Sequence, residues 1–149
     1  ELIIMKEGGK ILHEIKLKLV EKTKIGVSAF DVNKLAEELI EKSGGKASFK
    51  MVKEYSWATC ININKGLVHG IPHKDLIFKE GDLVSIDLGM YYKGFHTDTS
   101  ISFDLNGSDE VKKFLNAGRE AFNKAIAVVK PNNSYIYDIS KAIEDTVNK

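Results

Sequence analysis

Two aspartates, Asp87 and Asp98, interrupt strand-like apolar runs in the stretch VSIDLGMYYKGFHTDTS. A carboxylate within a strand gives up burial energy and needs a partner. The turn signal at residues 92–94 predicts a hairpin with a two-residue loop, and either register of such a loop places both aspartates on one face. Their Cβ atoms would lie roughly 5 Å apart if directly opposite and roughly 7 Å apart if diagonal.

Two carboxylates this close repel each other unless one is protonated or a cation lies between them. Oxygen ligands suit hard and borderline divalent ions, and a carboxylate pair can hold two ions. The alternative is a solvated polar face on which Thr97 or Thr99 satisfies Asp98. A three-residue loop would place the two aspartates on opposite faces. The hairpin therefore predicts a divalent-metal site, with a wet polar face as the alternative.

Three other side chains are candidates for chemistry. His69 lies in the loop GLVHGIPHKD, where Gly70 and Pro72 restrict the backbone next to the aspartate hairpin. His96 shares the face of the aspartates and is a candidate for orienting a ligand. Cys60 is the only cysteine and lies in a predicted strand, where most single cysteines fill the core.

The composition is that of one ordinary globular domain that buries a core, with 149 residues of which 43% are hydrophobic. The net charge of +1 and the scattered lysines predict neither nucleic-acid sequence readout nor a membrane surface. The apolar runs are too short for a membrane span. A lone cysteine excludes an internal disulfide, which favours a cytoplasmic location. The chain begins at Glu1, so we expect a processed or recombinant boundary there.

Helical patterns come first in the chain, strand patterns follow, and helical patterns then return. The first helix is predicted over residues 2–22, with close packing at its glycines and an apolar stripe of Met5, Leu12, Ile15 and Leu19. A second helix is predicted to begin at the cap Ser28, with Asp31 completing a capping box. Strands are expected at 47–52, 58–64, 82–90 and 94–103, and helical periodicity resumes at Ser108.

The returning helices repeat the first two. Residues 111–130 match 2–22 in outline, and 139–147 match 32–40, with Ser134 repeating the cap Ser28 within a one-residue shift. We therefore predict one domain over residues 1–149, with a first pseudo-repeat in 1–107 and the helical start of a second in 108–149. The alternative is a chance alignment of amphipathic helices.

The segments ELIIMKEGGKI, ATCININKGLVHGIP and KEGDLVSIDLGMYYKGFHTDTSISF together resemble the methionine aminopeptidases, over the whole chain. This resemblance implies an α+β pita-bread fold of the creatinase/aminopeptidase type. It implies an antiparallel sheet with helices on one face and, in this chain, an incomplete second pseudo-repeat. The implied activity is hydrolase chemistry, the metal-assisted excision of an N-terminal methionine.

The resemblance also implies roles for single residues. Asp87 matches a ligand of one metal and Asp98 a ligand that bridges two; His69 matches a catalytic histidine that binds substrate. Cys60 and Tyr55 match residues that line the methionine side-chain pocket. The implied cofactors are two divalent ions (Mn, Fe, Co or Zn). The implied partners are the N-terminal peptides of nascent proteins, methionine followed by a small residue, and the ribosome.

The chain departs from the family in its ligand set. It has no GHG segment and no histidine after His96, whereas the family takes one histidine and two glutamates from its second half. We therefore expect a truncated N-terminal portion that binds metal weakly or not at all and does not turn over. An incomplete repeat leaves an uncovered edge or apolar face, which favours a homodimer. The alternatives are a prolidase or aminopeptidase P relative and a non-catalytic pita-bread binding module.

Overall fold

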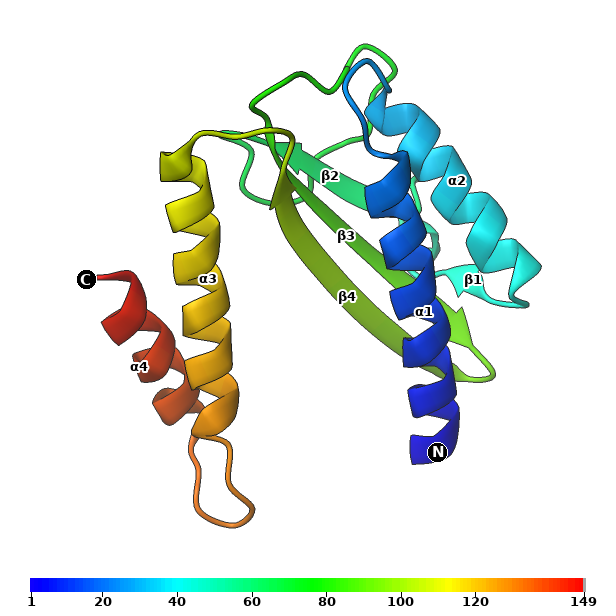
Figure 1. Cartoon of the computed structure of the whole chain (residues 1–149). Helices are drawn as coiled ribbons and strands as arrows, with labels where there is room; N and C mark the ends of the chain where they lie inside the picture. Colours follow the sequence, from blue (N-terminus) through cyan, green and yellow to red (C-terminus); the bar gives the residue numbers. More distant parts are fainter. Residues whose placement is uncertain (149) are drawn as a thin grey trace. The chain divides into compact units, whose positions relative to one another are not determined.

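The computed structural model describes residues 1–148, in two compact units, Glu1–Asn106 and Gly107–Lys149 (Figure 1). The first unit contains α1 (Leu2–Lys22), α2 (Ala29–Lys42), β1 (Lys46–Ala47), the short 3-10 helix η1 (Phe49–Met51), β2 (Thr59–Ile63), β3 (Leu83–Tyr92) and β4 (Phe95–Asp104). The second unit contains α3 (Asp109–Ala127) and α4 (Ile136–Val147). None of the helices described is both long and apolar enough to cross a membrane.

The antiparallel sheet of the first unit is built around β3. Strand β4 pairs with one edge of β3 over its whole length, while β2 and β1 pair with different parts of β3. The hairpin between β3 and β4 closes through Lys93 and Gly94, whose φ angles of 46° and 95° suit a two-residue turn. The structure therefore has the diagonal register of the two predicted, with Asp87 opposite Ser100 and Asp98 opposite Gly89.

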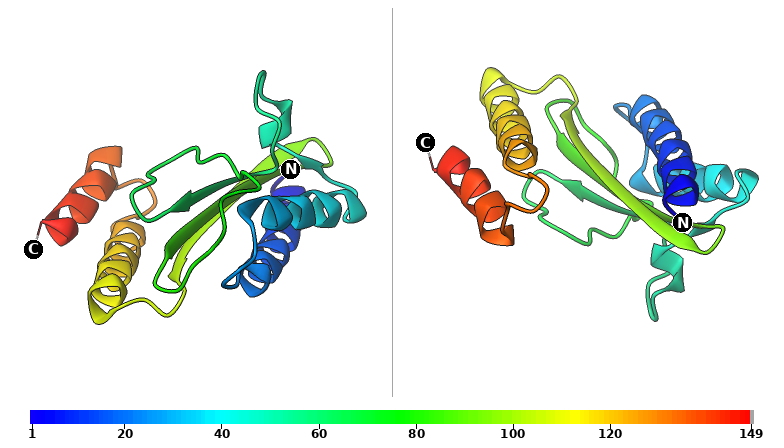
Figure 2. Two further views of the ribbon diagram at one scale, coloured as in Figure 1. Left: turned by 90° about the horizontal axis from the view of Figure 1, so that it is seen from above. Right: turned by 90° about the horizontal axis from the view of Figure 1, so that it is seen from below.

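Helices α1 and α2 cover one face of this sheet, and η1 lies on the other face (Figure 2). Alternation along β3 directs Ile86 and Leu88 toward the helices and leaves Asp87 on the opposite face. The helices and strands together bury a continuous core, formed by Leu12, Ile15, Leu19, Val32, Ala36, Ile40, Ile61, Val84, Ile86, Leu88 and Met90. The predicted sheet with helices on one face is confirmed in this unit.

The first helix approaches the sheet closely at Gly8. A Cβ atom at that position would meet Tyr92 Cβ at 3.5 Å and Thr97 Oγ1 at 3.6 Å, so the predicted close packing at a glycine is confirmed. The predicted apolar stripe is wrong at its first member, because Met5 is 40% exposed. Burial along α1 begins one turn later, at Gly8.

Helix α2 begins after the predicted cap Ser28. The Ser28 hydroxyl accepts from the backbone N–H of Asp31 at 3.1 Å and donates to the Asp31 carboxylate at 2.7 Å. The corresponding prediction for α4 is wrong. Ser134 instead donates to Val128 O and accepts from Lys130 N, which fastens the loop before α4. The N-terminus of α4 is capped by the Asp138 carboxylate, which accepts from the backbone N–H of residue 135 at 2.8 Å.

The predicted strand over residues 47–52 is also wrong for most of its length. Only Lys46–Ala47 pairs as a strand there, and the chain then turns into η1. The turn occurs at Ser48, whose backbone has φ −59° and ψ −40° and whose N–H donates to Gly89 O at 2.9 Å. This tertiary bond carries the following residues over the face of the sheet that the helices leave open.

In the second unit, α3 begins after Ser108, which accepts from the N–H of Val111 at 3.4 Å. Helices α3 and α4 pack against each other, as α1 and α2 do in the first unit. The assignment of the two units to two copies of one repeat stays a prediction.

Candidate functional site

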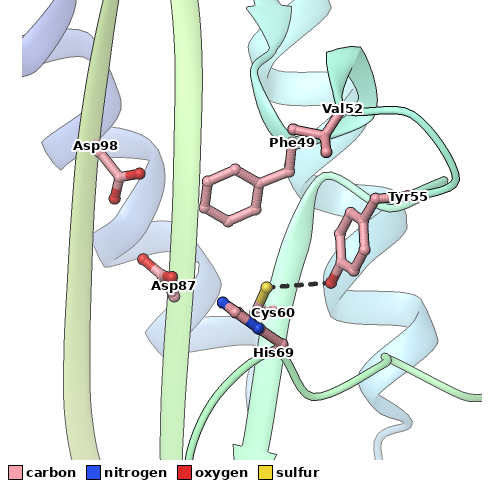
Figure 3. Close-up of a pocket in the computed structure, with 7 residues that line it drawn as sticks. All are labelled: Phe49, Val52, Tyr55, Cys60, His69, Asp87 and Asp98. Atoms are coloured by element: carbon pink, nitrogen blue, oxygen red, sulfur yellow. Dashed lines mark hydrogen bonds between the residues drawn. The ribbon is translucent and has the colours of Figure 1, made fainter.

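A pocket of about 390 Å³ lies on the face of the sheet that carries the aspartates (Figure 3). Five residues predicted from the sequence line this pocket: Tyr55, Cys60, His69, Asp87 and Asp98. It is also lined by Phe49 and Val52, which the sequence analysis missed, whereas the candidate His96 is not among its lining residues. All seven belong to the first unit. The fold therefore gathers the predicted residues into one place, while their individual roles stay predictions.

The two carboxylates converge from neighbouring strands in the diagonal register. Asp87 is partly buried and Asp98 is exposed. Burial raises the pKa of the Asp87 carboxyl from 3.8 to about 6, helped by the negative charge of Asp98 and by a hydrogen bond with that residue. The charge of His69 opposes this rise. The two carboxyl groups are therefore close enough to raise the pKa of Asp87 through their mutual repulsion.

His69 is held by an unusual stretch of backbone. Its φ angle of 55° is left-handed, which is uncommon for a residue with a side chain and is often found at functional sites. The next residue, Gly70, accepts a hydrogen bond from Ile61 N at 2.9 Å. A Cβ atom at position 70 would lie only 2.2 Å from Ile61 O, so only glycine fits against β2 here. Figure 3 shows the imidazole beside Cys60 and directed toward Asp87.

Tyr55 and Cys60 line the pocket beside the carboxylates, with Cys60 on β2 directly opposite Asp87 on β3. The Tyr55 hydroxyl donates to Thr59 O at 3.0 Å and lies 3.1 Å from Cys60 Sγ. Burial raises the pKa of the Cys60 thiol and that of the Tyr55 phenol, and the charge of Asp87 adds to both shifts. A thiol with a raised pKa stays protonated at neutral pH, so Cys60 is a poor nucleophile and a suitable lining for an apolar group.

A buried amide fixes the start of the strand that carries Cys60. The Oδ1 atom of Asn33, a residue only 2% exposed, accepts from the backbone N–H groups of Ala58 and Thr59 at 2.9 and 3.1 Å. It accepts from the Thr59 hydroxyl as well. Helix α2 thereby positions β2 and, with it, one side of the pocket.

Phe49 and Val52 complete the apolar side. The ring of Phe49 packs edge to face on Tyr55, with centroids 6.4 Å apart. It also lies over Gly89, where a Cβ atom would be 2.9 Å from Phe49 Cε1. The sequence analysis missed Phe49 and Val52 because it predicted their segment as a strand.

His96 lies on the same face, and its Nδ1 is 2.8 Å from the Ser48 hydroxyl. Its predicted role in orienting a ligand stays a prediction. Among residues 1–148 there is no group of three or more His, Cys, Asp or Glu side chains that converges as a metal site. In residues 1–148, two carboxylates beside an apolar compartment are therefore available as ligands for a cation.

Comparison with known proteins gives a consistent picture. The model of metallopeptidase family M24 matches residues 4–149. A methionine aminopeptidase of Aquifex aeolicus is 37% identical over 156 residues, which cover all of this chain and 60% of that protein. The crystal structure of methionine aminopeptidase from Thermotoga maritima matches with a TM-score of 0.94 at 34% identity, covering 99% of this chain and 59% of that one.

A prolidase from Pyrococcus furiosus shares the fold, with a TM-score of 0.85 at 20% identity. The predicted pita-bread fold and the predicted resemblance to methionine aminopeptidases are both confirmed. The chain spans about three fifths of the length of the methionine aminopeptidases it matches, with 60% of the Aquifex protein and 59% of the Thermotoga chain covered.

Proposed function

The chain belongs to metallopeptidase family M24, and from this premise we propose that it carries part of the active site of a methionine aminopeptidase. The observation that supports this most is the two-sided pocket. One side has two converging carboxylates and a histidine, and the other has Phe49, Val52, Tyr55 and Cys60. Such a pocket suits the N-terminus of a peptide, whose first side chain is apolar and whose amine and carbonyl are polar.

The donor set fits a divalent cation. Burial and the neighbouring charge of Asp98 raise the pKa of the Asp87 carboxyl, and a cation between Asp87 and Asp98 would offset both effects. We propose that Asp87 holds one ion and that Asp98 is shared by two, drawn from Mn, Fe, Co or Zn. When bound, such ions polarise a carbonyl and acidify water. Ligand type alone does not select among these metals.

The chain's own side chains would bind and orient the substrate. Cys60 and Tyr55, both neutral at physiological pH, would contact a methionine side chain without needing a charged partner. His69, at the edge of the carboxylate side, would hydrogen-bond the substrate and steady the oxygen on which negative charge develops. The substrates would be N-terminal peptides of nascent proteins with a small second residue, met in the cytoplasm near the ribosome.

Two carboxylates alone make a weak site. Because residues 1–148 contain no larger convergent group of ligands, we propose that these residues by themselves bind metal weakly and do not turn over substrate. The same observation favours a second candidate function, a non-catalytic pita-bread module that binds a protein partner. A prolidase relative is less favoured, because that likeness is one of fold at 20% identity.

Calorimetric titration with Mn²⁺ at pH 7.5 tests the metal site. The unmodified chain and a control, Asp75→Asn, which changes an exposed carboxylate outside the pocket, should release the same heat. Asp98→Asn should weaken binding about tenfold or more, since it removes one of two charged ligands. Equal heats from all three proteins would remove the metal from the proposal. Release of methionine from a Met-Ala-Ser peptide by this chain alone would refute its expected lack of turnover.

A further inference from the structure

A hydrogen bond joins Ser48, which directly precedes the pocket residue Phe49, to β4, the strand that carries Asp98. Ser48 Oγ lies 2.8 Å from His96 Nδ1, and Ser48 N donates to Gly89 O at 2.9 Å. Ser48 immediately precedes η1, where a serine commonly caps the helix with its hydroxyl. Here the hydroxyl makes no capping bond and is engaged by His96 instead. Ser48 is thus attached to both β3 and β4.

The residues after Ser48 form the wall. Phe49 follows directly, and its ring fits over Gly89 with no room for a Cβ atom there. The N–H groups of Met51, Val52 and Tyr55 each donate to a carbonyl three residues earlier, so these backbone bonds are local. The segment returns to the sheet at Tyr55, whose hydroxyl donates to Thr59 O. The contacts of Ser48 and of Tyr55 therefore attach the two ends of the wall to the sheet.

His96, the partner of Ser48, lies on β4 and contacts β3. His96 lies two residues before Asp98 on β4, and its ring packs against Tyr91, its cross-strand partner, with centroids 4.8 Å apart. Because residues two apart on a strand share a face, His96 and Asp98 lie on the same face of β4. The Ser48–His96 bond therefore sets the position of the wall relative to that of Asp98.

We propose that Ser48 and His96 form a latch that holds Phe49 and Val52 at a fixed position opposite the carboxylates, and that this wall selects an unbranched apolar N-terminal side chain. Both are positioning residues, since they act through Phe49 and Val52. The choice of substrate rests on the proposed function, whereas the latch concerns the free chain. A substrate side chain branched at Cβ is widest close to its backbone, where the wall faces the carboxylates. Loosening the wall should therefore allow such a side chain to bind.

Hydrogen exchange measured on the full chain tests the latch. Ser48→Ala should speed amide exchange in residues 49–55 by about tenfold or more while α1 keeps its protection, because a local attachment is lost. Emission of Trp57, whose ring lies 5.5 Å from that of Tyr55, should change with it. Ser48→Thr keeps a hydroxyl and should restore both. His96→Phe, which breaks the bond from the other side, should reproduce Ser48→Ala.

The matched control is Ser102→Ala, because Ser102 bonds Ser85 on the same face of the hairpin at 3.1 Å, among residues that do not line the pocket. It should leave residues 49–55 protected. Unchanged exchange in Ser48→Ala would overturn the latch, and so would an equal loss of protection throughout the first unit, which would make the contact merely structural.

Ligand selectivity tests the second half. With Mn²⁺ present, Trp57 emission is titrated with methioninamide and with isoleucinamide, and the unmodified chain should prefer the former by about tenfold. Ser48→Ala should reduce this preference severalfold, mainly through tighter binding of isoleucinamide, and Ser48→Thr should restore it. An unchanged preference with a loosened wall would overturn the role in selection. If the unmodified chain binds neither amide, the proposed function fails, and the exchange experiment still decides the latch.

Discussion

Replacing Asp87 by asparagine should stabilise the metal-free chain at neutral pH. Burial, the charge of Asp98 and a hydrogen bond with that residue raise the pKa of the Asp87 carboxyl from 3.8 to about 6 in the folded chain. Between these two pH values the folded chain binds more protons than the unfolded chain. The free energy of unfolding therefore receives its full contribution from this group below about pH 4 and loses it as the pH rises through about 6.

The size of the effect follows from the shift. About two pKa units correspond to about 3 kcal/mol. Asp87 is only partly buried, so water screens part of this penalty, and we expect about 1 to 1.5 kcal/mol from the substitution. Asparagine keeps the shape of the side chain and an oxygen that can accept the bond from Leu88. For a chain of this size the gain should raise Tm by about 2–5 °C.

The assay is thermal unfolding followed by circular dichroism, in EDTA, at pH 4.0 and pH 7.5. Asp87→Asn should have a higher Tm than the unmodified chain at pH 7.5 and nearly the same Tm at pH 4.0. Asp75→Asn, an exposed carboxylate, is the control and should change neither. A lower Tm for Asp87→Asn at pH 7.5, or an equal gain at both pH values, would refute the account of the carboxylate pair.

Three further changes have defined outcomes. Gly70→Ala should destabilise the first unit by about 2 kcal/mol in urea unfolding, because the new Cβ would meet Ile61 O at 2.2 Å and break the bond there; unchanged stability would contradict the close approach. Asn33→Ala should cost about 2–4 kcal/mol by the same assay, since three buried donors lose their acceptor; a loss below about 1 kcal/mol would show that water replaces it. Phe114 and Phe122 on α3 are 66% and 63% exposed, so the predicted homodimer should weaken in Phe122→Ser, as measured by light scattering across a concentration series. A monomer at all concentrations would end that prediction.

The hairpin and its carboxylates could be predicted because the information is local. Lys93 and Gly94 can adopt left-handed conformations at adjacent positions, which fixes the loop at two residues and both aspartates on one face. Both two-residue registers left open by the sequence share that outcome. The structure supplied the diagonal arrangement and excluded the three-residue loop that would have separated the aspartates.

The apolar wall could not be predicted, because its position depends on partners far away in the sequence. Residues 47–52 alternate as a strand would, yet Ser48 bonds Gly89 and His96 and turns the chain out of the extended conformation. Ser134 failed as a cap for a similar reason, since its hydroxyl bonds the preceding loop. Where a polar residue has several available partners, tertiary context determines its hydrogen bonds more than sequence spacing does.

The two-residue turn at Lys93 and Gly94 also limits how this hairpin can change in evolution. Side chains alternate along a strand, so inserting or deleting one residue anywhere between Asp87 and Asp98 would turn one carboxylate to the helix-covered face. Substitutions in this stretch can be many as long as the length is kept. The shared face of the two carboxylates depends on the number of residues between them, and only paired insertions or deletions preserve it.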